Sequence, residues 1–429
     1  MRRRHSLAAV AFAAAVVTDG LVVAGDERSG QVPAVLSLAD ALANARASNP
    51  ELRAAGQEVE IARGRLLKAR YLSQFNPVLS GEFAHRERNE PSDGGSVEDS
   101  AVTLSQEIEV AGQRARRIRE AEKTLARSEA EVRDRERLLD AAVKSEFFRA
   151  LTEARRVGLQ RAVEELNRRV RDAALARMRA GEAPAIEANL GEIRYGQARK
   201  ETLTAETERT AALIGLRRLL DLPPDAAIEP GGELRFIATE ISQAAALQKA
   251  LAARPDLVAA VREVERVEAE RSLTRRLAFP NPTVEAFLRE EDRGPDRIAG
   301  LGLTIPLPVF DRKQGELVEL AARGHQAHSQ VEAVRRKIEQ EVSDALQRYD
   351  AARRTLAVFE RDVLSRVEES FRLVETAYRA GKIDLFQLVV VQNDLVAAQL
   401  SYLDSLSRLR EAAVSLERDI AAPLDEVTP

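Results

Sequence analysis

The chain of 429 residues has no cysteine and no tryptophan, and only 4% of its residues are aromatic. Without cysteine it can form neither disulfide bonds nor thiolate metal sites, and it offers no thiol for lipid attachment. After the first 24 residues no segment approaches about eighteen uninterrupted apolar residues, the length that a membrane-spanning helix needs. If the chain crosses a membrane, we therefore expect it to cross with strands.

The first residues are predicted to be a leader. Basic residues in 1–5 precede an apolar stretch at 7–17, and Val22 and Ala24 supply small residues before a cleavage point. This order is typical of a secretory signal peptide over residues 1–24, with a disordered arm as the alternative, and residues 25–36 form a short N-terminal segment. The net charge of −4, which loss of the leader makes more negative, argues against nucleic acid as a partner.

The sequence repeats itself once. Three landmarks recur in the same order about 200 residues later: Pro50-Glu51-Leu52 as Pro255-Asp256-Leu257, Asn76-Pro77 as Asn281-Pro282, and Arg179-Ala180-Gly181 as Arg379-Ala380-Gly381. We predict repeat 1 at 37–221 and repeat 2 at 247–421. A linker at 222–246, with a small strand at 234–237, joins them, and a tail follows at 422–429.

The sixteen prolines are clustered, which leaves two proline-free runs at 92–183 and 309–422. Both runs are rich in strong helix formers. They predict helical hairpins at 113–221 and 312–421 whose tips lie at Gly181 and Gly381, where glycine ends the first helix of each pair. Apolar residues recur every seven positions and are typical of coiled coils: Ile118, Leu125, Val132 and Leu139. So narrow a stripe favours a wall one helix deep, with a compact helical bundle as the alternative.

A further helix is predicted ahead of each strand region. In repeat 1, Ser37 opens a sequence that resembles a capping box. Asn49 can cap a helix that starts at Pro50 and runs to about residue 72, and the copy runs from Pro255 to about residue 277.

Four shorter segments alternate between apolar and polar residues, as transmembrane strands do. They lie at 77–87 and 99–110 in repeat 1, and at 282–290 and 296–307 in repeat 2. The polar face of one strand is expected to line a lumen: Thr103, Ser105, Glu107 and Glu109. Four strands cannot close a barrel, so the chain must share its barrel with copies of itself. Two exposed hairpins lying on a helical domain are the alternative.

Several segments of the chain are similar to those of a known family. They are SLADALANARASNPEL (37–52), the two Asn-Pro pairs, LSQEIEVAGQRARRI (104–118), GLTIPLPVFDRKQG (302–315) and the two Arg-Ala-Gly tips. Together they resemble the TolC family of outer-membrane efflux proteins over nearly the whole mature length. Segments 104–118 and 302–315 resemble most the CzcC branch, the outer component of heavy-metal exporters.

The resemblance implies a mainly α fold with a membrane β-barrel portion. A twelve-stranded β-barrel and an α-helical barrel would be completed in a homotrimer that stands in the outer membrane of a Gram-negative-type bacterium and extends into the periplasm. It implies a passive efflux duct, not an enzyme, in a tripartite RND-type system for heavy-metal cations. The expected partners are a periplasmic adaptor protein, an inner-membrane RND transporter and outer-membrane lipid.

Other functions fit parts of the pattern. A duct for drugs and organic compounds, or for type I secretion, is the nearest alternative. A periplasmic adaptor or a coiled-coil scaffold belongs to a different class, and neither would show a duplicated amphipathic strand pair.

The resemblance also assigns candidate sites. The adaptor-docking tips are Arg179, Ala180, Gly181, Arg379, Ala380 and Gly381. The candidates for the periplasmic entrance are Glu182, Glu187, Asp384, Gln387 and Asp394, although Gln387 and Val390 stand where the family often carries acids. The residues show no catalytic constellation, and we expect no cofactor. His325 and His328 are spaced to share a metal, but a solvated helix face is the favoured interpretation.

Overall fold

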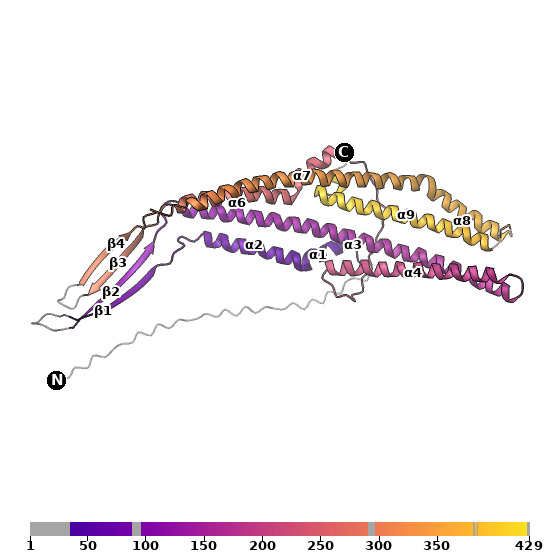
Figure 1. Ribbon diagram of the computed structural model, residues 1–429, viewed down its shortest axis with the longest axis horizontal. Coiled ribbons are helices and arrows are strands. Elements are labelled where there is room, and N and C mark those ends of the chain that lie inside the picture. Colours follow the sequence, from indigo (N-terminus) through magenta and orange to yellow (C-terminus); the bar gives the residue numbers. More distant parts are fainter. Residues whose placement is uncertain (1–34, 88–95, 291–296, 381, 384, 427–429) are drawn as a thin grey trace, which may run out of the picture.

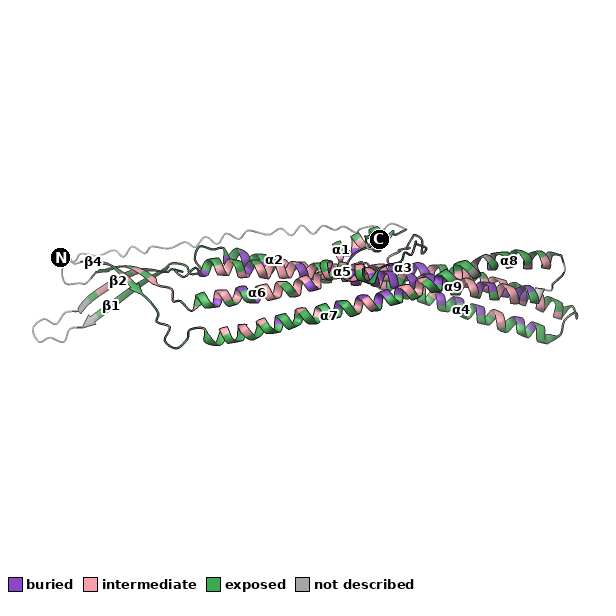
Figure 2. Ribbon diagram, turned by 90° about the horizontal axis from the view of Figure 1, so that it is seen from above, coloured by how far each residue is buried: buried purple, intermediate pink, exposed green. Residues whose placement is uncertain are grey.

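The computed structural model describes residues 35–87, 96–290, 297–380, 382–383 and 385–426. The molecule is a long, gently bowed rod with a small sheet at one end and two helical hairpin tips at the other (Figure 1). The predicted signal peptide and residues 25–34 lie outside the described residues. Buried residues form narrow seams between helices whose outer faces are exposed (Figure 2). The rod excludes the compact bundle and agrees with the predicted wall.

The elements follow one another in two matching sets. Repeat 1 comprises α1 (Leu38–Ser48), α2 (Pro50–Ala69), β1 (Val78–Glu87), β2 (Ser96–Glu107), α3 (Gln113–Arg179) and α4 (Ala185–Leu219). Repeat 2 comprises α5 (Gln243–Ala253), α6 (Pro255–Leu277), β3 (Thr283–Glu290), β4 (Arg297–Thr304), α7 (Gln314–Val358), a π-helix (Phe359–Val363), α8 (Leu364–Arg379), α9 (Leu385–Ile420) and a 3-10 turn (Leu424–Glu426). Because α5 is the copy of α1, repeat 2 begins inside the predicted linker.

Polar caps start the first two helices as predicted. The Ser37 hydroxyl accepts the Asp40 N–H at 3.1 Å. The Asn49 side-chain oxygen accepts the N–H groups of Glu51 and Leu52 at 3.0 and 3.1 Å, ahead of Pro50. Each side chain satisfies backbone donors that the first turn leaves without partners.

The four strands form one antiparallel sheet in the order β1-β2-β3-β4. β2 pairs with β3, with Val102 opposite Leu288, so the two repeats meet in a single sheet. β4 ends at Thr304, short of the predicted residue 307, because prolines at 306 and 308 cannot donate ladder hydrogen bonds. The small strand predicted at 234–237 is wrong, since that segment forms no ladder.

Small residues let α3 and α4 approach closely. A seam of small buried residues runs along α4: Ala188, Gly191, Ala198, Ala205 and Ala212. A Cβ added at Gly191 would lie 3.1 Å from the Arg171 Cα. The two largest clusters of buried apolar side chains lie near the middle of the rod, around Phe147 in repeat 1 and Tyr349 in repeat 2, and a smaller cluster forms around Leu66 toward the sheet. Close backbone contact therefore holds α3 and α4 together, while the two largest hydrophobic clusters hold the middle of the rod, which we call the waist.

Candidate functional site

The first hairpin tip closes with a hydrogen-bonded glycine turn. Gly181 has φ +75°, in the left-handed region that favours glycine. Its N–H donates to the Met178 carbonyl at 3.0 Å, and the Glu182 N–H reaches back to the Arg177 carbonyl at 2.9 Å. These two bonds form a Schellman motif, which satisfies carbonyls that the end of α3 would otherwise leave without partners.

The second tip repeats the bond that spans five residues of the turn. The Lys382 N–H donates to the Ala377 carbonyl at 2.9 Å, as Glu182 does to Arg177 in the first tip. Ala380 follows the last residue of α8, Arg379, as Ala180 follows Arg179. Gly381 lies outside the described residues. Figure 1 shows both tips at the end of the rod that is farthest from the sheet.

The structure brings only part of the candidate entrance together. Glu182 and Glu187 belong to the first tip, and Glu187 lies 3.6 Å from the Arg177 guanidinium across the hairpin. Gln387 and Asp394 lie on α9, behind the second tip, and both are exposed. Asp384 lies outside the described residues. Glu187 therefore already has a cationic neighbour within its own chain, a contact that sequence spacing alone did not indicate.

In the described part of the chain, three contacts between polar side chains tie the two hairpins together along α3 and α9. Lys144 donates to Glu417 at 2.7 Å near the waist, and Arg156 donates to Asp404 at 2.5 Å. Nearer the tips the buried Asn167 amide lies 3.3 Å from the Asn393 side-chain oxygen: Asn167 Nδ2 donates to Asn393 Oδ1. Sequence reasoning missed all three. Polar residues are frequent along α3 and α9, and their spacing does not indicate which of them contact each other.

The sheet has two unlike faces. Residues directly opposite in neighbouring strands share a face, and one face is apolar and exposed: Leu79, Phe83, Val102, Leu104, Val284, Leu288, Leu301 and Leu303. Thr103, Ser105 and Glu107 lie on the opposite face, together with Glu285. This alternation matches the predicted strand pattern.

Glu109 does not belong to that polar face. β2 ends at Glu107, and Glu109 lies two residues beyond it, almost buried against Arg117. The Ile108 N–H donates to the Pro282 carbonyl at 2.9 Å, but Pro282 has no N–H to donate in return, so the regular pairing ends here. A buried, paired carboxylate cannot line a lumen, so this part of the prediction is corrected.

The two histidines are exposed on α7. The His328 ring nitrogen Nδ1 lies 2.9 Å from the Gly324 carbonyl oxygen one turn earlier. Within the described part of the chain no group of three His, Cys, Asp or Glu residues is placed to hold a metal ion. Among those same residues no helix is both long and apolar enough to cross a membrane.

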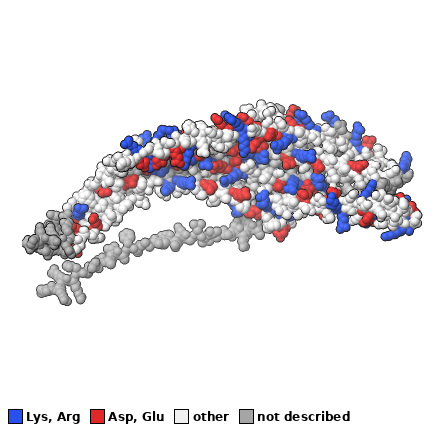
Figure 3. Space-filling view, viewed as in Figure 1, with Lys and Arg blue, Asp and Glu red and all other residues white. Residues whose placement is uncertain are grey.

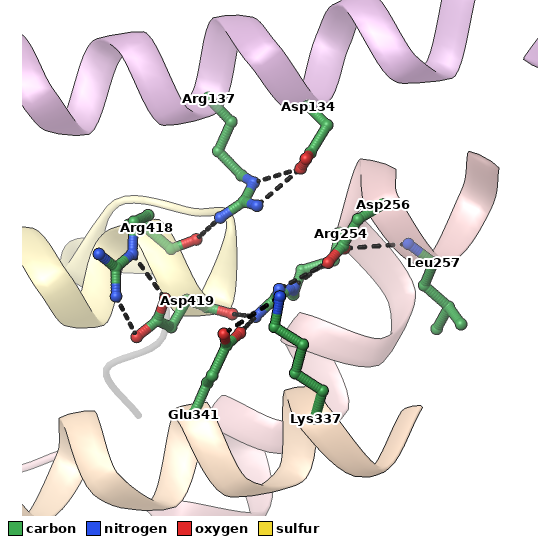
Figure 4. Close-up of polar contacts among 9 residues, drawn as sticks. All are labelled: Asp134, Arg137, Arg254, Asp256, Leu257, Lys337, Glu341, Arg418 and Asp419. Carbon is green, nitrogen blue, oxygen red and sulfur yellow. Dashed lines mark hydrogen bonds and ion pairs between the residues drawn. The ribbon is translucent and has the colours of Figure 1, made fainter. Parts of the chain in front are cut away.

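Charged side chains of both signs are interspersed over the helices, while the sheet end is mostly uncharged (Figure 3). The most buried of these groups is Arg254, between α5 and α6, whose side chain is 2% exposed. It makes a two-pronged contact with Asp256 at 2.6 and 3.0 Å and a third bond to Glu341 on α7 at 2.7 Å. A weaker bond of 3.3 Å reaches the Asp419 carbonyl at the end of α9 (Figure 4).

Arg254 therefore joins three helices of repeat 2 at the waist. Burial favours its neutral form, but the hydrogen bonds and charges of Asp256 and Glu341 outweigh burial and raise its pKa. Burial also favours the protonated form of Asp256, yet the Arg254 contact lowers the pKa of that carboxyl below its ordinary value. Arg137 on α3 donates to the Arg418 carbonyl at 2.5 Å, which links this cluster to repeat 1 (Figure 4).

A second arginine pins the linker to the waist. The Arg410 guanidinium stacks between the rings of Phe148 and Phe236, 4.6 and 4.0 Å from their centroids. It donates to the carbonyls of Leu234 and Arg235 at 2.6 and 3.0 Å. These bonds use backbone groups that the predicted strand would have paired in a ladder. Burial lowers the pKa of Arg410.

The π-helix interrupts the long helix of repeat 2 just past the waist. Its Glu360 accepts from Arg235 of the linker at 3.1 Å and from the Tyr402 hydroxyl of α9 at 3.3 Å. A π-turn is closed by i→i+5 hydrogen bonds and is rare inside α-helices. In repeat 1, α3 runs through the corresponding region without interruption.

Both repeats match the same family of known proteins. The profile of the family described as "Outer membrane efflux protein" matches residues 41–221 and 246–421. The cobalt-zinc-cadmium resistance protein CzcC of Cupriavidus metallidurans is 26% identical over 383 residues, 89% of each chain. A membrane protein from Pseudomonas aeruginosa has a similar structure, with a TM-score of 0.73, 21% identity and 91% of each chain covered. VceC, an outer membrane protein of Vibrio cholerae, gives a TM-score of 0.70 at 17% identity, covering 90% of this chain and 96% of its own.

Proposed function

We infer that this chain, which belongs to the outer membrane efflux protein family, is the outer-membrane duct of a tripartite pump for heavy-metal cations. The family match spans both repeats. The chain is an outer-membrane efflux channel that extends into the periplasm, and it acts as a passive conduit, not an enzyme.

The observation that carries the assembly is the sheet. Its apolar face is exposed, and within the described residues β1 and β4 each have one edge without a partner. In a lipid bilayer unpaired backbone groups cost several kcal/mol each, so such edges must find other strands. We propose that three copies of the chain close the sheet into a twelve-stranded barrel, with the apolar face toward lipid and the Thr103 face toward the lumen.

The likeness to CzcC supports heavy-metal cations as cargo, since that relative is named for cobalt, zinc and cadmium resistance. A duct that only conducts cations has no need of a tight metal site, because tight binding slows release. The exposed His325 and His328 fit this view, with one ring already facing a backbone carbonyl.

The tips support a docking role. The matching backbone turns at Glu182 and Lys382 present two similar helix ends at one end of the rod. We propose that a periplasmic adaptor protein packs its own helical hairpin against these ends and connects the duct to an inner-membrane RND transporter. The exposed Arg179 side chain offers a charged contact at the rim of the first tip.

The experiment has three measurements. The full chain should fractionate with the outer membrane, migrate in mild detergent at about three times its monomer mass, and conduct ions in planar bilayers. In a strain that lacks its own outer component, co-expression with a metal-type adaptor and transporter should restore resistance to cobalt, zinc or cadmium. A detergent-free monomer would refute the duct, whereas restored drug resistance without metal resistance would refute only the cargo.

A further inference from the structure

Exposed apolar side chains ring the place where the sheet meets the helices. We call this place the junction and define it as the four crossover segments 70–77, 108–112, 278–282 and 305–313. Each segment carries at least one large exposed apolar residue: Tyr71, Leu72, Phe75, Ile108, Val110, Phe279, Leu307, Val309 and Phe310. Phe310 is 91% exposed and Leu72 is 89% exposed. Large exposed apolar side chains gathered in one region mark a site that binds a partner molecule or a membrane.

Arginines lie beside this apolar ring. Five exposed arginines lie in the crossovers or within four residues of one: Arg70, Arg114, Arg275, Arg276 and Arg312. Arg70 and Arg275 occupy equivalent positions of the two repeats. Within the described residues none of the five guanidinium groups forms an ion pair with a carboxylate, whereas many arginines of the helical wall do. Arg114 donates to the backbone carbonyls of Arg70 and Tyr71, at 2.9 and 3.1 Å.

The acids of the junction are already occupied. Asp311 and Glu316 both contact the Lys313 ammonium at 3.0 Å. Glu109 is almost buried against Arg117, and Glu107 accepts a hydrogen bond from the Asn281 amide at 2.8 Å. The remaining arginines therefore leave a surplus of positive charge at the apolar ring.

We propose that the junction binds anionic phospholipid headgroups of the periplasmic leaflet, with the arginines on the phosphates and the apolar ring among the acyl chains. The inference rests on the proposed function, which sets the junction at the edge of the bilayer. Aromatic side chains prefer this depth of a membrane, and basic groups beside it attract anionic lipid. Free phosphate would match the arginines alone and would leave the apolar ring in water, so the surface commits to lipid.

The test measures lipid binding to the full-length protein in mild detergent. The probes are dioctanoyl phosphatidylglycerol, dioctanoyl phosphatidylcholine and inorganic phosphate, each titrated separately. The junction variant carries Arg70→Gln, Arg275→Gln, Arg276→Gln and Arg312→Gln, and keeps Arg114 because it holds the end of α2. We expect phosphatidylglycerol to bind the native protein more tightly than phosphatidylcholine. Its dissociation constant should rise by about fivefold for each arginine removed.

A matched control removes the same charge elsewhere. It carries Arg199→Gln, Arg218→Gln, Arg335→Gln and Arg354→Gln, four exposed arginines of the helical wall, and it should bind phosphatidylglycerol as the native protein does. If the junction variant fails to assemble, replacement of the same four arginines by lysine keeps the charge and should keep most of the lipid preference.

Three outcomes would overturn the inference: equal binding of the two lipids by the native protein, an unchanged junction variant, or full competition by inorganic phosphate. Conductance in phosphatidylcholine bilayers is measured alongside and separates the two claims. A conducting protein without lipid preference refutes only the inference, whereas a native protein that never conducts refutes the duct.

Discussion

Replacing Arg254 should destabilise the waist more than any exposed ion pair can. Arg254→Met keeps much of the side-chain volume but removes the partner of Asp256, the closer of the two cationic partners of Glu341 (Lys337 remains at 3.6 Å) and a donor to the Asp419 carbonyl. Breaking a buried ion pair by removing one member costs about 3–5 kcal/mol, because the charge left behind is poorly solvated. Here the two carboxylate side chains are 20% and 31% exposed and regain some water, so we expect about 3 kcal/mol, the lower end of that range.

The assay is the urea-induced unfolding of the detergent-solubilised protein, followed by far-ultraviolet circular dichroism. The matched control is Arg63→Met. Arg63 pairs with Glu60 on the surface of α2, with the two side chains 57% and 56% exposed. Such pairs contribute about 0–1 kcal/mol, so the control should unfold nearly as the native protein does. Equal midpoints for the two variants would show that the Arg254 contacts do not stabilise the waist.

The same comparison has a pH dependence with a definite sign. The pKa of Asp256 is lower in the folded chain than its ordinary value of 3.8. A carboxyl with a depressed pKa contributes stability above its unfolded pKa and loses it as pH falls through the folded pKa. The stability gap between the native protein and Arg254→Met should therefore be full at neutral pH and narrow below about pH 4. A gap that widens in acid would contradict the assigned ion pair.

Three further predictions concern the tips, the sheet and the entrance. Gly181→Val should cost about 1–2 kcal/mol of stability at the left-handed turn and abolish metal resistance while trimers still form. The control Gly196→Ala, at an open position in α4, should leave resistance intact. Full resistance in Gly181→Val would mean that the glycine only ends a helix. A Cβ at Gly300 would lie 2.3 Å from the tip of the Phe287 ring, so Gly300→Ala should lower the melting temperature. The double variant with Phe287→Ala should recover part of the lost melting temperature. A double variant no more stable than Gly300→Ala would contradict this contact. Glu187→Gln with Asp384→Asn should reduce the cation selectivity of single channels and weaken block by divalent cations, and unchanged selectivity would place the constriction elsewhere.

Local signals in the sequence predicted most of the elements well. The two proline-free runs located the hairpins, Gly181 located the first tip, and Asn49 ahead of Pro50 located the start of α2. Alternation located the strands to within a few residues, with the largest error of three residues at the ends of β2 and β4. Helix ends, caps and strand alternation depend on residues that are close together in the sequence, so one sequence is enough to predict them.

The contacts that hold the elements together could not be predicted. The pairing of β2 with β3 and the bonds of Arg254 and Arg410 all join residues far apart in the chain. Nothing in the spacing of Asn167 indicates that its partner is Asn393. Glu109 was misplaced for the same reason, since alternation continues past Glu107 although the distant Pro282, which has no N–H, cannot continue the ladder.

The π-helix at Phe359–Val363 makes the two hairpins unequal in phase. Each residue of an α-helix turns the side-chain direction by about 100°, whereas a π-turn spreads one turn over more residues and so changes the direction of every later side chain relative to the earlier ones. The helical phase of α8 is therefore not a direct continuation of that of α7. In repeat 1, α3 keeps one phase from Gln113 to Arg179. The two tips therefore lie at the ends of helices with different hydrogen-bond patterns, although their closing turns share a backbone hydrogen bond.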